Sequence, residues 1–179
     1  MRRIAAAALF ALCLAPHLAL ACWEEAGARY GVSPQLLYAM ARVESGLRPA
    51  AVNNSHRKDT GSYDVGLMQI NSSHLPRLAR HGINEDNLYD PCTNIQVGAW
   101  LLAHEFSRHG VSWEGVGAYN AACTRLRGQA CRAARAKYVW LVYRHLPTAL
   151  QSASASRIAV PAARAETVPV PILAVRVAP

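Results

Sequence analysis

Apolar residues recur at helical spacing in the first third of the chain. Four of them lie three or four residues apart, as on one face of an amphipathic helix: Leu36, Met40, Val43 and Leu47. Ser33 and Pro34 before them form a typical helix start, with Ser as the N-cap and Pro in the first turn. Gly46 is a typical helix end. Glu44 lies one position from the apolar stripe, so we expect it at the edge of the buried face.

Similar signals predict further helices along the chain. Asp90-Pro91 opens a long helix, and Ser112 caps a shorter one. The predicted helices span residues 22–30, 34–46, 74–81, 90–109, 112–119 and 132–144, with a buried helical turn at 67–70. Residues 49–65 are rich in Asn, Ser, His, Gly and Asp, which favours a loop or a short hairpin. The pattern therefore predicts a mainly α domain with a small irregular or β lobe.

The two ends of the chain differ from this domain. Residues 1–21 combine Arg2-Arg3, an apolar run and the small residues Ala19 and Ala21, which is typical of a cleaved signal peptide. The run is short for a membrane span of about 20 apolar residues, so an uncleaved anchor is the less favoured alternative. Residues 22–146 form the predicted domain, and the Ala/Val/Pro-rich residues 147–179 a disordered tail. We expect export to the periplasm and no stable membrane span in the mature chain.

Export changes the interpretation of the cysteines. Four of the five follow the signal peptide, and an even number in an oxidising compartment favours two disulfides. Cys123 and Cys131 are close enough in sequence to close one loop, which leaves Cys22 with Cys92. A zinc site is the alternative, but the chain has no Cys-x-x-Cys pair to support one. We expect no metal and no cofactor.

The formal net charge of +8 is compatible with anionic partners, among them cell-wall glycan strands, nucleic acid and membrane surfaces. The basic residues are scattered, so charge alone does not choose among these partners. The sequence also has no phosphate-binding loop and no nucleotide-binding fingerprint.

Glu44 is the strongest candidate for chemistry. It is the only acidic residue between Glu25 and Asp59, and it lies among apolar residues. Partial desolvation of its carboxyl would raise its pKa, because a low dielectric disfavours the charged form. A carboxylic acid still protonated near neutral pH is what glycosidic bond cleavage requires. The alternative is an exposed carboxylate paired with Arg48, which would contribute only a few tenths of a kcal/mol.

Three short motifs favour the first interpretation. They are Glu44-Ser45-Gly46-Leu47, Gly66-Leu67-Met68-Gln69-Ile70-Asn71 and Ala118-Tyr119-Asn120-Ala121. In this order and spacing they resemble the signature motifs of the lytic transglycosylases with a lysozyme-like fold. Cys22-Trp23, Asp90-Pro91-Cys92 and the run from Ser112 to Asn120 are similar to the small exported members that serve secretion, conjugation and pilus machines.

The resemblance implies a peptidoglycan-cleaving enzyme with Glu44 as its sole catalytic acid and base. The 6-hydroxyl of the muramic acid would attack its own anomeric carbon, giving a 1,6-anhydro sugar. Tyr119 would hydrogen-bond or orient Glu44, and Ser45 would support it. Gln69 and Asn120 would bind sugar polar groups, Met68 would line the sugar subsite, and Gly66 would let the backbone approach the substrate. Implied partners are glycan strands and components of an envelope transport complex, with no nucleic acid.

One departure and two alternatives remain. The family usually has Gly after the third motif, whereas this chain has Ala122-Cys123, so a special backbone angle there is in question. Asp59 or Asp64 facing Glu44 would instead make a hydrolytic lysozyme, because hydrolysis employs a second carboxylate. A peptidoglycan-binding assembly module that does not cut is the third hypothesis.

Overall fold

The computed structural model describes residues 21–148 and 151. The predicted signal peptide and tail fall almost entirely outside these residues. Within the described part most residues are helical and three short antiparallel strands form one small sheet. The prediction of a mainly α fold with a small β lobe is therefore confirmed. No helix of the described residues has the length and hydropathy that crossing a membrane requires.

The helices follow the predicted order. A first helix covers residues 21–30. The others are α2 (Pro34–Glu44), α3 (Arg57–Thr60), α4 (Leu75–Leu78), α5 (Pro91–His109), α6 (Trp113–Asn120) and α7 (Gly128–Tyr143), with 3-10 turns η1 (Ser72–His74), η2 (Ala79–His81) and η3 (Asp86–Tyr89). The expected caps are present, because the side chains of Ser33, Asp90 and Ser112 accept hydrogen bonds from the first turns of α2, α5 and α6.

The sheet has two different faces. Its strands β1 (Val52–Asn53), β2 (Asp64–Val65) and β3 (Ile70–Asn71) pair in the order β1-β2-β3, with Val65 opposite Val52 and Ile70, and Asp64 opposite Asn53 and Asn71. Successive side chains of a strand point to opposite faces. Val65 and Ile70 are accordingly buried in the core. Asn53, Asp64 and Asn71 form the polar face.

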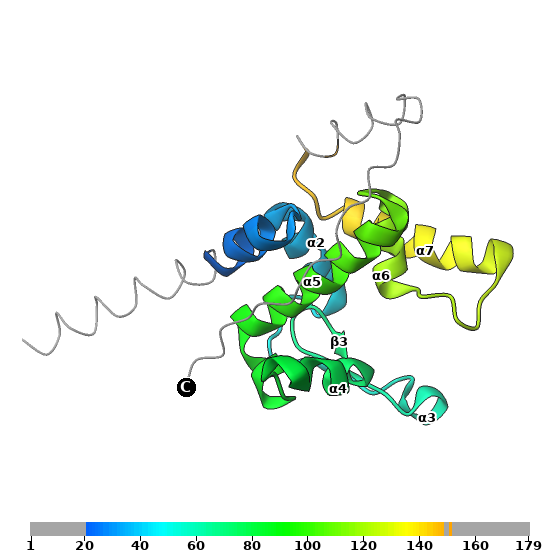
Figure 1. Ribbon diagram of the computed structural model, residues 1–179. Helices are drawn as coiled ribbons and strands as arrows, with labels where there is room; N and C mark the ends of the chain where they lie inside the picture. The colour runs from blue at the N-terminus through cyan, green and yellow to red at the C-terminus, as the bar shows by residue number, and fades with distance from the viewer. Residues whose placement is uncertain (1–20, 149–150, 152–179) are drawn as a thin grey trace, which may run out of the picture.

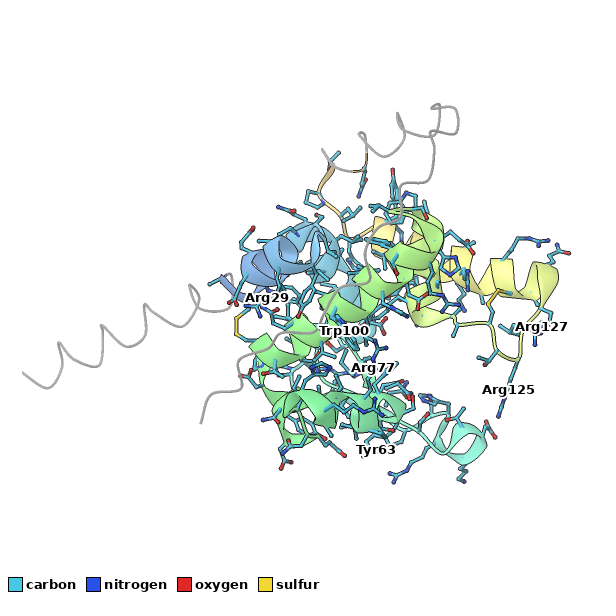
Figure 2. All side chains as sticks on the ribbon, viewed as in Figure 1. Arg29, Tyr63, Arg77, Trp100, Arg125 and Arg127 are labelled. Carbon is cyan, nitrogen blue, oxygen red and sulfur yellow. A yellow bond between two sulfur atoms is a disulfide. The ribbon has the colours of Figure 1, made fainter. Side chains whose placement is uncertain are left out.

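Helix α5 is the centre of the molecule (Figure 1). It contacts α2, α6 and β3, and α7 packs against both α2 and α6. Trp100 in the middle of α5 is 1% exposed, and the Arg77 guanidinium lies over its ring, 4.2 Å from the centroid (Figure 2). The core is therefore built around α5. The sheet, α3 and α4 lie together on one side of this helix (Figure 1).

Three sequence predictions differ from the structure. In α2 the fully buried residues are Leu37, Met40 and neighbouring alanines, whereas three residues of the predicted stripe are only partly buried against the core: Leu36, Val43 and Leu47. The helical turn predicted at residues 67–70 is absent: residues 66–69 form a turn that leads into β3, because Gly66 and Gln69 have positive φ values of 81° and 48°, which end a helix. Helix α7 begins at Gly128, four residues before the predicted start.

Both predicted disulfides are present. Cys22–Cys92 joins the first helix to the start of α5, with 5.3 Å between the Cα atoms. Cys123–Cys131 joins the loop after α6 to the first turn of α7, with a Cα–Cα distance of 5.6 Å.

Candidate active site

A cleft of about 750 Å³ separates the sheet from the helices. The polar face of the sheet lines one wall, with Asn53, Asp64 and Asn71. Glu44, Tyr119 and Asn120 line the other wall, which α2 and α6 supply. The volume is in the range of sites that enclose most of a small ligand.

Glu44 is the last residue of α2. It follows Leu37, Met40 and Ala41 at helical spacing and is itself only partly buried, so it lies at the edge of the buried face, as predicted, where that face meets the cleft. The Tyr138 hydroxyl, from α7, donates a hydrogen bond to Glu44 Oε1 at 2.6 Å. The carboxyl is therefore held between the core and the cleft, with one oxygen fixed.

This environment raises the pKa of Glu44 to about 7 from its ordinary 4.5. Desolvation by burial is the main cause, and the negative charge of Asp64 adds to it. Hydrogen bonds from Tyr138 and Asn120 oppose the rise. Burial and the nearby Glu44 raise the pKa of Tyr138 well above its usual value, so Tyr138 remains a protonated donor. Glu44 can thus give and take a proton near neutral pH.

A buried asparagine fixes the turn at residues 66–69. Asn94, 0% exposed on α5, accepts a hydrogen bond from Met68 N at 2.7 Å and donates to the carbonyls of Val65 and Leu88. The Ser45 hydroxyl donates to Leu67 O at 2.8 Å. The Ser45 side chain therefore joins the end of α2 to the backbone of the turn at residues 66–69.

Gly66 is required by this arrangement. Its φ of 81° lies in the left-handed region, and an added Cβ would lie 2.1 Å from Asn94 Nδ2 and 2.6 Å from Leu88 O. The close approach predicted at Gly66 thus occurs, but to Asn94 and not towards the cleft. Ser45 is also buried, at 4% exposure, and its contacts hold the backbone rather than a ligand.

Two predictions about the site are corrected. Met68 is 0% exposed, so its side chain belongs to the core and cannot line a sugar subsite. The Tyr119 hydroxyl donates to Met68 O at 2.9 Å, whereas Tyr138 binds Glu44. Tyr119 therefore fixes the turn from the α6 side.

Gln69 and Asn120 both line the cleft. Gln69 Nε2 donates to Gly66 O at 2.9 Å and to Ala51 O at 3.3 Å, so its amide oxygen is the atom offered to a ligand. On the wall formed by the sheet, Asn71 and Asn53 donate to the two oxygens of Asp64, at 2.7 and 3.2 Å. Asp59, the other acidic candidate, lies on α3.

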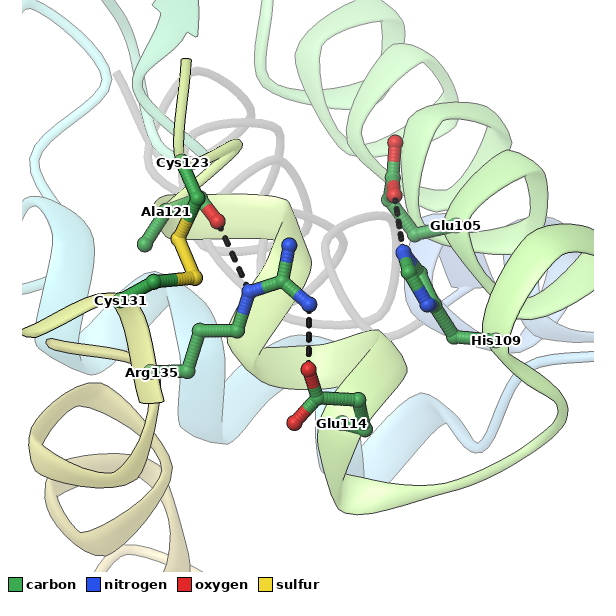
Figure 3. The surroundings of a disulfide bond; sticks show 7 residues. All are labelled: Glu105, His109, Glu114, Ala121, Cys123, Cys131 and Arg135. Carbon is green, nitrogen blue, oxygen red and sulfur yellow. Dashed lines mark hydrogen bonds and ion pairs between the residues drawn. A yellow bond between two sulfur atoms is a disulfide. The ribbon is translucent and has the colours of Figure 1, made fainter. Parts of the chain in front are cut away.

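The loop after α6 is held at its base (Figure 3). Arg135, 9% exposed on α7, donates to Ala121 O at 3.0 Å and forms an ion pair with Glu114 of α6. Ala122, which stands where the family usually has Gly, has no positive φ, and the left-handed angle falls one residue later, at Cys123, with a φ of 57°. A side chain in this conformation costs roughly 1–2 kcal/mol, and the disulfide to Cys131 holds it in place.

Sequence reasoning missed Tyr138 and Asn94. Tyr138 lies 94 residues from Glu44 in a stretch rich in aromatic residues, and no spacing singles it out. Asn94 had a readable signal, because an asparagine inside a helix and among apolar residues must find buried partners.

Comparison with known proteins identifies the family. The transglycosylase SLT domain model matches residues 21–139. Invasion protein IagB of Salmonella typhimurium is 44% identical over 126 residues, covering 70% of this chain and 76% of that protein. Protein IpgF of Shigella flexneri is 41% identical over 135 residues, 74% of this chain and 84% of the relative. These matches confirm the resemblance seen in the motifs. The chain belongs to the transglycosylase SLT domain family and is a lytic transglycosylase.

Proposed function

We propose that this enzyme cleaves the β-1,4 bond between N-acetylmuramic acid and N-acetylglucosamine in peptidoglycan and leaves a 1,6-anhydro end. The observation that carries the proposal is Glu44, whose pKa of about 7 keeps much of it protonated at neutral pH. It lies in the wall of a cleft of about 750 Å³. An acid of this pKa is close to the optimum for general acid–base catalysis at neutral pH.

The proposed reaction uses Glu44 twice. Protonated Glu44 first donates its proton to the glycosidic oxygen while the bond from that oxygen to the anomeric carbon breaks. The resulting carboxylate then takes the proton of the muramic acid 6-hydroxyl as that oxygen bonds to the anomeric carbon. The proton balance closes and no water is consumed. Intramolecular attack also benefits from a high effective molarity.

The surrounding residues would position Glu44 and the sugar. The Tyr138 hydroxyl fixes one carboxyl oxygen of Glu44 at 2.6 Å, and Asn120 also hydrogen-bonds this carboxyl. The Gln69 amide oxygen and the Asn120 side chain suit the N-acetyl and hydroxyl groups of a glycan, since both line the cleft. Ser45, Gly66 and Tyr119 act through the backbone that holds these groups.

Hydrolysis is the second candidate, and one observation favours it. Asp64 lines the same cleft as Glu44, and a carboxylate there is able to activate a water molecule. Its two oxygens, however, already accept hydrogen bonds from Asn53 and Asn71. The two reactions differ in their product, because hydrolysis leaves a reducing end with an added water.

Mass spectrometry of peptidoglycan sacculi digested with the purified protein separates these candidates. Muropeptides that end in 1,6-anhydro-muramic acid are the expected result. Reducing ends would mean a lysozyme and would direct attention to Asp64. Bound glycan without any soluble product would favour the assembly module.

The cellular setting is part of the same proposal. We propose that the enzyme acts in the periplasm and opens the wall locally for a secretion, conjugation or pilus apparatus. The predicted signal peptide supports export, and the relative named as an invasion protein supports a role beside an envelope apparatus. Fractionation of cells that express the full chain tests the first point, with the periplasmic fraction as the expected location.

A further inference from the structure

One hydrogen bond joins the two sides of the cleft at its mouth. Arg125, in the loop between α6 and α7, donates from Nη2 to the carbonyl oxygen of Asp59 in α3 at 2.9 Å. The two residues are 66 positions apart in the sequence. Figure 2 shows the Arg125 side chain extending from the loop towards α3.

The bond lies beside the cleft and not on a remote surface. Thr60 and Ser62, one and three residues after Asp59, line the cleft from the α3 side, and Cys123 and Thr124 line it from the loop side. Arg125 therefore crosses between two segments that both face the ligand space. A polymer lying in the cleft beneath this bond could leave sideways only after the bond opens.

The loop is built to support such a contact. Cys123–Cys131 closes its base, and Arg135 holds the preceding carbonyl of Ala121. The base is therefore fixed, and the long Arg125 side chain extends from it to α3. The acceptor is a main-chain carbonyl of α3, so the contact does not depend on the Asp59 carboxylate.

We propose that Arg125 retains the substrate: its bond to α3 closes the cleft over a bound glycan strand, so that one strand is cut several times before it is released. This inference rests on the proposed function, because it takes a glycan polymer as the occupant of the cleft. The bond is exposed, and an exposed hydrogen bond contributes only modestly to the free energy of closing the cleft. This Arg125–Asp59 bond, which we call the clasp, therefore slows the lateral exit of a glycan strand. It still opens often enough to admit internal segments of a strand.

The test measures successive cuts on long, peptide-free glycan strands at low conversion. Arg125→Ala should lower the number of cuts per encounter about fivefold, which corresponds to about 1 kcal/mol, with little change in the rate of a single cut. Arg127→Ala is the matched control, because it removes the same charge from the same loop and should change neither quantity. Equal behaviour of the two variants would overturn the proposal.

The disulfide supplies a second route to the same effect. Cys123→Ser with Cys131→Ser frees the loop base and should reduce successive cuts as far as Arg125→Ala does. Adding Arg125→Ala to that double variant should give no further loss, since both changes open one clasp. Additive losses would mean that the loop acts in another way. Arg125→Ala alone keeps the proposal testable if the disulfide variant folds poorly.

A readout without catalysis separates this inference from the proposed function. In a Glu44→Gln background, which should not cut, dissociation from immobilised glycan strands should be about fivefold faster with Arg125→Ala and unchanged with Arg127→Ala. Faster release from the Arg125→Ala variant, together with no anhydro product from the unmodified enzyme, would support the clasp and contradict the proposed reaction. Normal anhydro products with equal release rates would overturn the clasp alone.

Discussion

The two walls of the cleft each present a carboxylate, in opposite surroundings. Glu44 ends α2, at the edge of the buried face of that helix, and burial raises the pKa of Glu44 to about 7. Asp64 lies on the polar face of the sheet, where Asn53 and Asn71 donate to both of its oxygens. Desolvation of a carboxyl favours its neutral form. The helical wall thus presents a buried carboxyl that keeps a proton near neutral pH, whereas the sheet wall presents a carboxylate whose two oxygens already accept hydrogen bonds.

Two isosteric substitutions test the difference between the two carboxylates and should have the largest effect. Glu44→Gln should lower the cleavage rate about 10³-fold, because a general acid contributes about 10²–10⁴. Asp64→Asn should lower it less than about tenfold, since the loss is limited to local hydrogen bonding. Product formation from sacculi measures both variants. An equal loss in the two would mean that both carboxylates take part in the chemistry, as in a hydrolase.

Glycine substitutions compare the backbones of the two sides. Gly66→Ala should destabilise the fold by about 3–4 kcal/mol, because a positive φ of 81° adds to overlap with Asn94 and Leu88. Gly61→Ala, at the end of α3, has a similar φ of 73° and open space around it, so about 1–2 kcal/mol is expected. Denaturant unfolding measures both free energies. Similar losses would show that the packing at Gly66 is not required.

The raised pKa also predicts a cost in stability. The folded pKa of Glu44 is about 7 against 4.5, so its favourable contribution is complete below pH 4.5 and is lost as the pH rises through 7. Glu44→Gln removes this loss. The variant should match the parent near pH 4 and exceed its free energy of unfolding by about 2–3 kcal/mol at pH 8. A constant difference across this range would contradict the desolvation of Glu44.

The smallest expected effect distinguishes two tyrosines. Tyr138→Phe removes a hydrogen bond that lowers the pKa of Glu44, so the alkaline limb of the rate profile should move up by about one pH unit. Tyr119→Phe removes the bond to Met68 O and should leave that limb in place. The pH dependence of kcat/KM measures both. A shift in Tyr119→Phe alone would restore the role predicted for it from the sequence.

Local features of the fold could be predicted, and distant contacts could not. The caps at Ser33, Asp90 and Ser112 depend on neighbouring residues, so the sequence predicts them directly. The partner of Glu44 is Tyr138, 94 residues away, and only the packing of α7 against α2 brings them together.

The same distinction explains the errors in the site. Met68 and Tyr119 belong to motifs of the family, and the motifs alone predict that Met68 contacts the sugar and that Tyr119 contacts Glu44. Their contacts instead hold the backbone of the turn at residues 66–69. A motif thus predicts which residues belong to the site, whereas burial and hydrogen bonding decide how each one acts.

Carbon-13 NMR titration of the Glu44 carboxyl, with Glu44→Gln to assign the resonance, measures whether Glu44 keeps a proton near neutral pH. We expect a midpoint near 7. We also expect a higher midpoint in Tyr138→Phe. A midpoint near the ordinary 4.5 would mean that the helical wall does not hold a proton on Glu44, and it would contradict the proposed acid.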